Sequence, residues 1–302
     1  MRKRMFKLGI FIGVIIISLG VILFFLKKIN APATMNNKIN VTTSFYPLYF
    51  LTSQIGGDLV NVNNLTPAGT EPHDYELTAR DIAKIKKSKL LILNGGGLEI
   101  WAESVKKNIS FKNPLVVNLG EGLVSQEDPH IWLSPTLAIK MAEKISKGLI
   151  EVDSQNKSYY ESNFNILKTK LVNLDSAYKA SLADCQRKDI ITSHSAFIYL
   201  AKDYGLRQIS IAGLSPEEEP SSKQLADVTQ FARDNNVKYI FFESLVSPKL
   251  SQTIAKEIGA KILILNPIEG LTEKELNQGR DYLTEMNTNL ENLKIALECK
   301  NN

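Results

Sequence analysis

The chain is poor in histidine, with only three in 302 residues, and it has only two cysteines. Beyond residue 30, basic residues do not outnumber acidic ones. The first 30 residues hold six of the 36 Lys and Arg and no Asp or Glu, so the remainder has 30 basic against 32 acidic residues, a net charge of −2. Nucleic-acid-binding proteins need a basic surface, so this balance excludes that class. The glycine triplet at 95–97 lacks the Lys-Ser or Lys-Thr pair of a phosphate-binding loop, which favours a plain turn.

An uncharged apolar run of 19 residues, 8–26, has four basic residues before it and two just after it. At about 1.5 Å per residue it nearly matches a hydrocarbon core of ~30 Å, whereas signal-peptide apolar regions are about 7–15 residues long. We predict a transmembrane anchor at 1–28 with its N-terminus inside, followed by a polar tether at 29–38. The alternative is a signal cleaved near Ala31-Pro32-Ala33. Both place the rest of the chain outside the cytoplasm. No cysteine lies near the end of the run, which excludes lipid attachment there.

Short apolar runs alternate with helical patterns along the rest of the chain. Strands are expected at 39–46, 59–65, 90–93, 115–118, 189–192, 208–212, 238–242 and 261–265. Helices are expected at 78–87, 100–107, 137–152 and 279–298, together with a longer one at about 155–183 that contains no Gly or Pro. Further helices are expected between the last four strands. This alternation predicts an α/β fold with parallel sheets flanked by helices, and the long helix could connect two lobes.

The two cysteines, Cys185 and Cys299, fit an extracytoplasmic location, where disulfides persist. We predict a bridge between them that ties the C-terminal helix to the start of the second lobe. Two unpaired buried thiols are the alternative.

The three histidines lie in polar, turn-like stretches: His73 in GTEPHDY, His130 in DPHIW and His194 in TSHS. Ligands bind beyond the carboxyl ends of strands in open α/β sheets. His194 follows the predicted strand 189–192, and Glu269 follows 261–265 across an Asn-Pro turn. Three imidazoles and one carboxylate are a plausible four-coordinate zinc set, whereas manganese prefers more oxygen ligands. The spacing matches no short zinc signature, and a single histidine in a turn is more often a surface or hydrogen-bonding residue.

Five motifs, in order, resemble the zinc and manganese solute-binding proteins of ABC importers, over nearly all of residues 39–298. They are GTEPHDY at 69–75, DPHIWLSP at 128–135, SHSAF at 193–197, GLSPEEEPS at 213–221 and LNPIEGL at 265–271. The resemblance implies two α/β metal-binding lobes, 39–152 and 185–302, joined by a linking helix at 153–184, with the metal in the cleft between the lobes.

The resemblance also implies a ligand set. His73 and His130 are expected from the first lobe, and His194 and Glu269 from the second. The manganese branch usually has Glu as its third ligand, so His194 favours Zn²⁺ over Mn²⁺. Some members use an Asp in the loop of Glu269, and a solvated carboxylate is the alternative there. Glu243 is a candidate to support a ligand from behind, the alternative being a helix cap or a salt bridge.

The sequence departs from the family in two respects. Many zinc-binding members carry a His-rich loop between the first two ligands, but residues 74–129 contain no histidine. Many Gram-positive members are anchored through a lipidated cysteine, whereas this chain is expected to use a membrane helix.

The function expected from the resemblance is extracytoplasmic capture of zinc and its delivery to an ABC permease, without catalysis. A manganese-binding member of the family and a zinc-dependent hydrolase are the alternatives. A hydrolase needs an open coordination position and a general base, and Glu269 as fourth ligand would close that position. An adhesin with the same fold is a further alternative that the sequence does not separate.

Overall fold

The computed structural model describes residues 38–108, 114–125 and 128–300. The predicted anchor at 1–28 and all but the last residue of the tether at 29–38 lie outside these ranges. Within them, no helix is both long and apolar enough to cross a membrane.

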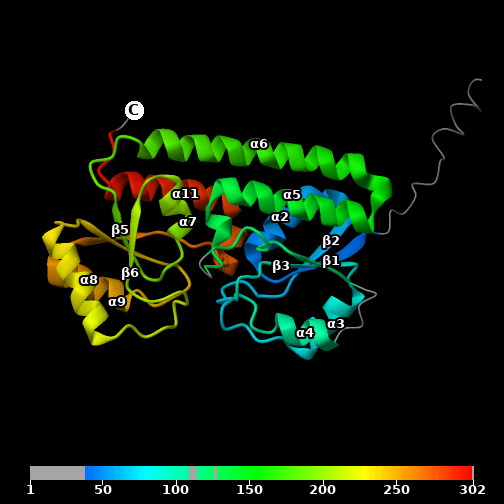
Figure 1. The fold of residues 1–302 in the computed structure, drawn as a ribbon, viewed down its shortest axis with the longest axis horizontal. Coiled ribbons are helices and arrows are strands. Elements are labelled where there is room, and N and C mark those ends of the chain that lie inside the picture. Colours follow the sequence, from blue (N-terminus) through cyan, green and yellow to red (C-terminus); the bar gives the residue numbers. More distant parts are fainter. Residues whose placement is uncertain (1–37, 109–113, 126–127, 301–302) are drawn as a thin grey trace, which may run out of the picture. The chain divides into compact units, whose positions relative to one another are not determined.

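Two parallel four-stranded sheets form the framework (Figure 1). The first contains β1 (Ile39–Thr43), β2 (Val60–Asn64), β3 (Leu90–Leu93) and β4 (Leu115–Asn118) in the order β2-β1-β3-β4. The second contains β5 (Asp189–Thr192), β6 (Arg207–Ser210), β7 (Tyr239–Phe242) and β8 (Lys261–Ile264) in the order β6-β5-β7-β8. We call each sheet with its helices a lobe. The predicted α/β fold is confirmed.

Helices cover both sheets. The first lobe has α2 (Tyr46–Gly56), α3 (Ala79–Lys87), α4 (Ala102–Asn108) and α5 (Pro135–Val152). The second has α7 (Ile198–Asp203), α8 (Ser222–Asp234), α9 (Lys249–Ile258), α10 (Glu273–Asn277) and α11 (Tyr282–Ala296). The long helix α6 (Lys157–Leu182) packs against α2 and α5 of the first lobe and α11 of the second (Figure 1). It therefore joins the lobes, as predicted.

The main hydrophobic core runs through both lobes without a break. It includes Val41 of β1, Leu171 of α6, Phe241 of β7 and Leu293 of α11, with Trp132 among them. Two smaller apolar clusters lie beside it in the described part of the chain. One lies between the first sheet and the α3–α4 region, and the other between the second sheet and α8 and α9. The lobes therefore share apolar packing on the side of α6.

Helix α2 is the main difference from the expected elements, because strand 39–46 ends early and the chain turns into a helix at Tyr46. Phe45 is extended, and Pro47 occupies the first turn, where its missing N–H costs no hydrogen bond. Leu48, Leu51 and Ile55 are fully buried. An apolar helix buried on most sides has no polar stripe, so its sequence lacks the pattern that marks a surface helix.

Cys185 and Cys299 form a disulfide with a sequence separation of 114 residues, so the predicted bridge is present. It ties the chain just after α6 to the end of α11.

Replacing both cysteines with serine should lower the free energy of unfolding by about 2–5 kcal/mol, because the bridge restricts a long loop in the unfolded chain. Urea unfolding checks this, and the wild type under reducing conditions should match the variant. Equal stability of oxidised wild type and variant would contradict the prediction.

Candidate metal site

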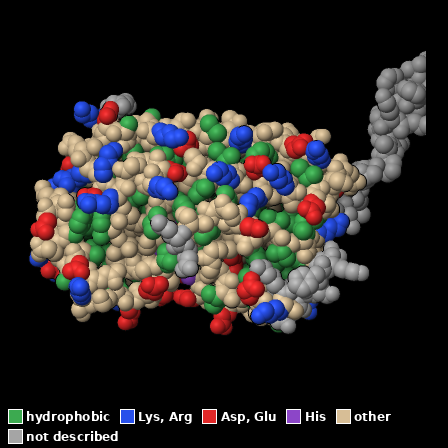
Figure 2. All heavy atoms as spheres, in the orientation of Figure 1, with side chains coloured by type: hydrophobic (Ala, Val, Ile, Leu, Met, Phe, Trp, Pro, Cys, Tyr) green, Lys and Arg blue, Asp and Glu red, His purple; other side chains and the backbone are tan. Residues whose placement is uncertain are grey.

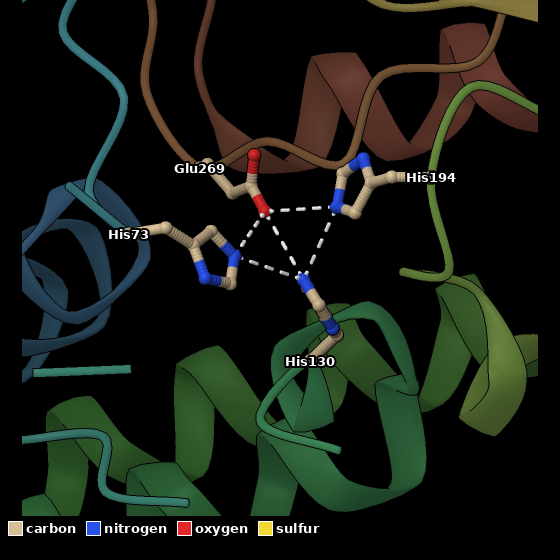
Figure 3. A group of neighbouring side chains, drawn as sticks. All are labelled: His73, His130, His194 and Glu269. Carbon is tan, nitrogen blue, oxygen red and sulfur yellow. Dashed lines mark hydrogen bonds and ion pairs between the residues drawn. The ribbon is translucent and has the colours of Figure 1, made fainter. Parts of the chain in front are cut away.

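Four side chains from four separate loops converge on one point between the lobes (Figure 3). His73 lies in the loop after β2, and His130 directly precedes a 3₁₀ turn at Ile131–Leu133. His194 and Glu269 follow β5 and β8. The structure thus brings together all four ligands expected from the sequence.

Five of the six distances between the four donor atoms match the edges of a tetrahedron around a zinc ion. Glu269 Oε1 lies 3.2 Å from His73 Nε2, 3.1 Å from His130 Nε2 and 3.3 Å from His194 Nε2. His130 Nε2 is 3.3 Å from the Nε2 atoms of both His73 and His194, and the remaining pair lies within 4.8 Å. Ligand atoms about 2.0–2.1 Å from a tetrahedral zinc ion are about 3.3–3.4 Å apart. Five of the six separations therefore fit such an ion.

A buried carboxylate holds each of the two fully buried imidazoles from behind. Asp128 Oδ1 accepts from His130 Nδ1 at 2.7 Å and from the His130 backbone N–H at 2.9 Å. Glu243 Oε1 does the same for His194, at 2.7 and 3.2 Å. A proton fixed on Nδ1 leaves the Nε2 lone pair facing the centre, as in carboxylate–histidine–zinc arrangements.

Further hydrogen bonds fix the loops that carry these histidines. The Tyr199 hydroxyl of α7 donates to Asp128 O at 2.8 Å and accepts from the Ser125 backbone N–H at 2.8 Å. Asn94 Nδ2 donates to Pro129 O at 2.8 Å, next to His130. On the second lobe, Gln208 Nε2 donates to His194 O at 2.9 Å. The first-lobe loop of His130 is thus held partly by a helix of the second lobe.

The buried carboxylates of the site need positive charge beside them to balance their own negative charge. Burial alone would lower the pKa of His130, but its bonds to Asp128 and Glu269 outweigh burial and raise it. Burial likewise opposes protonation of His194, yet the charges of Glu243 and Glu269 raise its pKa well above the usual value. Burial would raise the pKa of Glu269, but the charge of His194 and the bond from His130 hold it well below its ordinary range. Protons on the imidazoles, or a bound cation, balance the buried carboxylates.

Two acidic residues near the ligands were not assigned from the sequence. Asp128 supports His130, and its place two residues before a histidine in a turn is the signal that could have identified it. Glu71 Oε1 accepts from the His73 backbone N–H at 3.2 Å. Burial and the nearby charge of Glu269 raise the pKa of Glu71 to about 9. The raised pKa of Glu71 depends on the Glu269 loop lying close to it, and the sequence does not show that the two loops approach each other.

The acidic run of the GLSPEEEPS motif lies apart from this ligand set. Glu217, Glu218 and Glu219 are all exposed, and they line an open pocket beside Ser193. The space-filling view shows a small area of histidine at the lower edge of the molecule, with acidic side chains on both sides (Figure 2). His73 is the most exposed ligand candidate, at 11% of its side chain.

Comparisons with known proteins identify the family of the chain. A family model described as "Zinc-uptake complex component A periplasmic" matches residues 41–296. The high-affinity zinc uptake system protein ZnuA of Bacillus subtilis (strain 168) is 40% identical over 284 residues, which cover 87% of this chain and 89% of that protein. Zinc-binding lipoprotein AdcA of Streptococcus pneumoniae (strain ATCC BAA-255 / R6) is 37% identical, but the match covers 86% of this chain and only 56% of AdcA.

Solved structures give the same relationship. The Zn(II)-bound ZnuA-like domain of Streptococcus pneumoniae AdcA aligns with a TM-score of 0.78 and 38% identity, covering 86% of this chain and 99% of that one. The laminin-binding protein Lmb of Streptococcus agalactiae, described as bifunctional with adhesin and metal transporting activity, aligns with a TM-score of 0.79 and 34% identity over 86% and 99% of the two chains. The family match and these alignments show that the chain belongs to the ZnuA family of zinc-uptake components.

Proposed function

We propose that this chain captures Zn²⁺ outside the cytoplasm and delivers it to an ABC-type permease in the membrane. The observation that carries the proposal is the convergence of four donor atoms, His73, His130 and His194 Nε2 and Glu269 Oε1, with five of their six separations suited to one tetrahedral ion. Three of the four residues are buried, and His73 is partly buried. The names of the relatives, zinc uptake and zinc-binding proteins, support the same cargo.

The donor set favours zinc over manganese. Three imidazole nitrogens and a single carboxylate oxygen suit Zn²⁺, whereas Mn²⁺ favours carboxylate, carbonyl and water oxygens. The same set argues against a zinc hydrolase, because Glu269 fills the fourth position that a catalytic site leaves open for water.

The arrangement along the chain belongs to the proposal as well. Residues 39–152 and 185–302 would form the two metal-binding lobes, with 153–184 as the linking helix. The apolar segment within 1–28 would hold the protein at the outer face of the membrane, close to its permease.

Metal titration of the full-length protein in detergent tests the function. One Zn²⁺ should bind per chain, far more tightly than Mn²⁺. Glu269→Gln should weaken zinc binding, because it removes the negative charge that faces the three imidazoles. Absence of zinc binding by the wild type would refute the function. Unchanged affinity in Glu269→Gln would mean that another group is the fourth ligand.

Zinc affinity should also fall as the pH is lowered. Because the pKa values of His130 and His194 are raised, these imidazoles keep their second proton up to a higher pH in the metal-free protein than a free imidazole does, and Zn²⁺ must displace that proton to reach Nε2. Below the raised pKa values, affinity should drop about tenfold per pH unit for each displaced proton. Competition titrations between pH 8 and pH 5 measure the slope, and a flat profile would contradict the prediction.

A further inference from the structure

The turn that presents Glu269 has a strained backbone. Ile268 has φ +57°, one of three non-glycine residues with positive φ in the described ranges, and the other two are Asn236 and Glu298. Asparagine tolerates this left-handed conformation, but for a β-branched residue it is a genuine outlier. Ile268 is fully buried and directly precedes the proposed ligand. Such strain persists only where the surroundings impose it, and it is typical of ligand clamps.

A buried amide clamp imposes the conformation. The Asn266 backbone N–H donates to Asn289 Oδ1 at 2.8 Å, and Asn289 Nδ2 donates back to Asn266 O at 2.6 Å. Asn266 Oδ1 in turn accepts from the Ile268 N–H at 2.8 Å and closes the turn. The turn is thus fixed from helix α11 through Asn289.

Two more contacts hold the same turn. Trp132 Nε1 donates to Pro267 O at 2.7 Å from the first-lobe side. Asn266 Nδ2 donates to Glu285 Oε2 at 3.3 Å, and Arg280 Nη2 donates to that oxygen at 2.7 Å. Asn266, Glu285 and Asn289 are all at most 2% exposed, so this polar network is shielded from water.

The carboxylate that this turn carries presents one oxygen to the imidazoles. Glu269 Oε1 alone lies 3.1–3.3 Å from all three imidazole nitrogens, while its second oxygen points away from them (Figure 3). A carboxylate held in this way gives one oxygen to a bound ion, which completes a four-coordinate set. If the turn relaxed, the carboxylate could rotate and offer both oxygens, which suits cations that prefer more oxygen ligands.

We propose that the Asn266–Asn289 clamp is a positioning and specificity device: it holds the Ile268 turn so that Glu269 offers one oxygen, and thereby favours Zn²⁺ over Mn²⁺. The inference rests on the proposed zinc-binding function. It predicts that weakening the clamp reduces metal discrimination more than it reduces the ability of the protein to fold.

Asn289→Ala in the full-length protein is the test, with Asn292→Ala as its matched control. Asn292 lies one turn further along α11, and its Nδ2 also donates to a backbone carbonyl, that of Ile264 at 2.8 Å, but the contact is exposed. Asn289→Ala should lower the ratio of Zn²⁺ to Mn²⁺ affinity at least about tenfold. Bound Co²⁺ should lose the intense visible absorption of four-coordinate cobalt. Asn292→Ala should change neither quantity.

The outcomes separate the inference from the function. If Asn289→Ala does not fold, Asn289→Ser leaves a smaller void and still cannot make both clamp bonds, so the same two measurements apply to it. An unchanged affinity ratio and cobalt spectrum in the folded variant would overturn the inference alone. A wild-type protein that binds no zinc would overturn the proposed function and the inference with it.

Discussion

Replacing His73 with alanine should weaken zinc binding about 100- to 1,000-fold while leaving the protein folded. Four-ligand zinc sites contribute about 10–16 kcal/mol, so an equal share per ligand is about 2.5–4 kcal/mol, which corresponds to that loss of affinity. Competition titration against a chelator of known affinity measures the change. Glu76→Ala is the control, because Glu76 is exposed in the same loop and lies outside the ligand set.

His73 is the ligand best suited to this test, because its side chain is 11% exposed and it belongs to a surface loop. His130 and His194 are fully buried against Asp128 and Glu243. Removing either of those histidines would leave a buried carboxylate without its partner and would destabilise the fold as well as the site. A loss of less than about threefold in His73→Ala would show that His73 does not bind the ion, since a lost ligand costs far more.

The sequence predicted the framework well because the strands are short, apolar and bounded by polar turns. Strands β3, β4 and β5 have the expected bounds, and α6 lies inside the expected long helix with a difference of two residues or less at each end. The order of strands in each sheet was not predicted, because sequence patterns do not specify which strands become neighbours. Helix α2 was not predicted, because burial on most sides removes the periodicity that identifies a helix.

The candidate site divides in the same way. The scarcity of histidine and the five motifs indicated His73, His130, His194 and Glu269, and the structure brings these side chains together. Their role as ligands stays a prediction until metal is titrated. Glu243 was predicted as a residue that supports a ligand, and the structure pairs it with His194. Other contacts that orient the site join residues far apart in the chain without any signal in the sequence, such as Tyr199 with Asp128 and Asn289 with Asn266. No local spacing encodes such pairs, so only the folded chain reveals them.

Replacing Trp132 with alanine should lower the free energy of unfolding by about 4–6 kcal/mol. Removing a buried tryptophan side chain typically costs about 3–5 kcal/mol, and the loss of a partner for a buried carbonyl adds about 1 kcal/mol or more. Here that carbonyl belongs to Pro267, which accepts from the indole N–H at 2.7 Å. The ring is fully buried and packs edge-on against Phe45, with centroids 4.7 Å apart. Urea unfolding followed by far-UV circular dichroism measures the loss.

Trp101 provides the matched control, because it is the only other tryptophan in the chain. It is partly buried beside the small cluster between the first sheet and the α3–α4 region, and it is not part of the main hydrophobic core. Trp101→Ala should therefore cost less than half as much as Trp132→Ala. Trp132→Phe keeps most of the apolar volume and should cost about 1–2 kcal/mol, chiefly for the orphaned Pro267 carbonyl. Comparable losses in Trp132→Ala and Trp101→Ala would contradict the shared core. A dominant loss in Trp132→Ala is expected because this residue packs in the core common to both lobes and bonds the loop that carries Glu269.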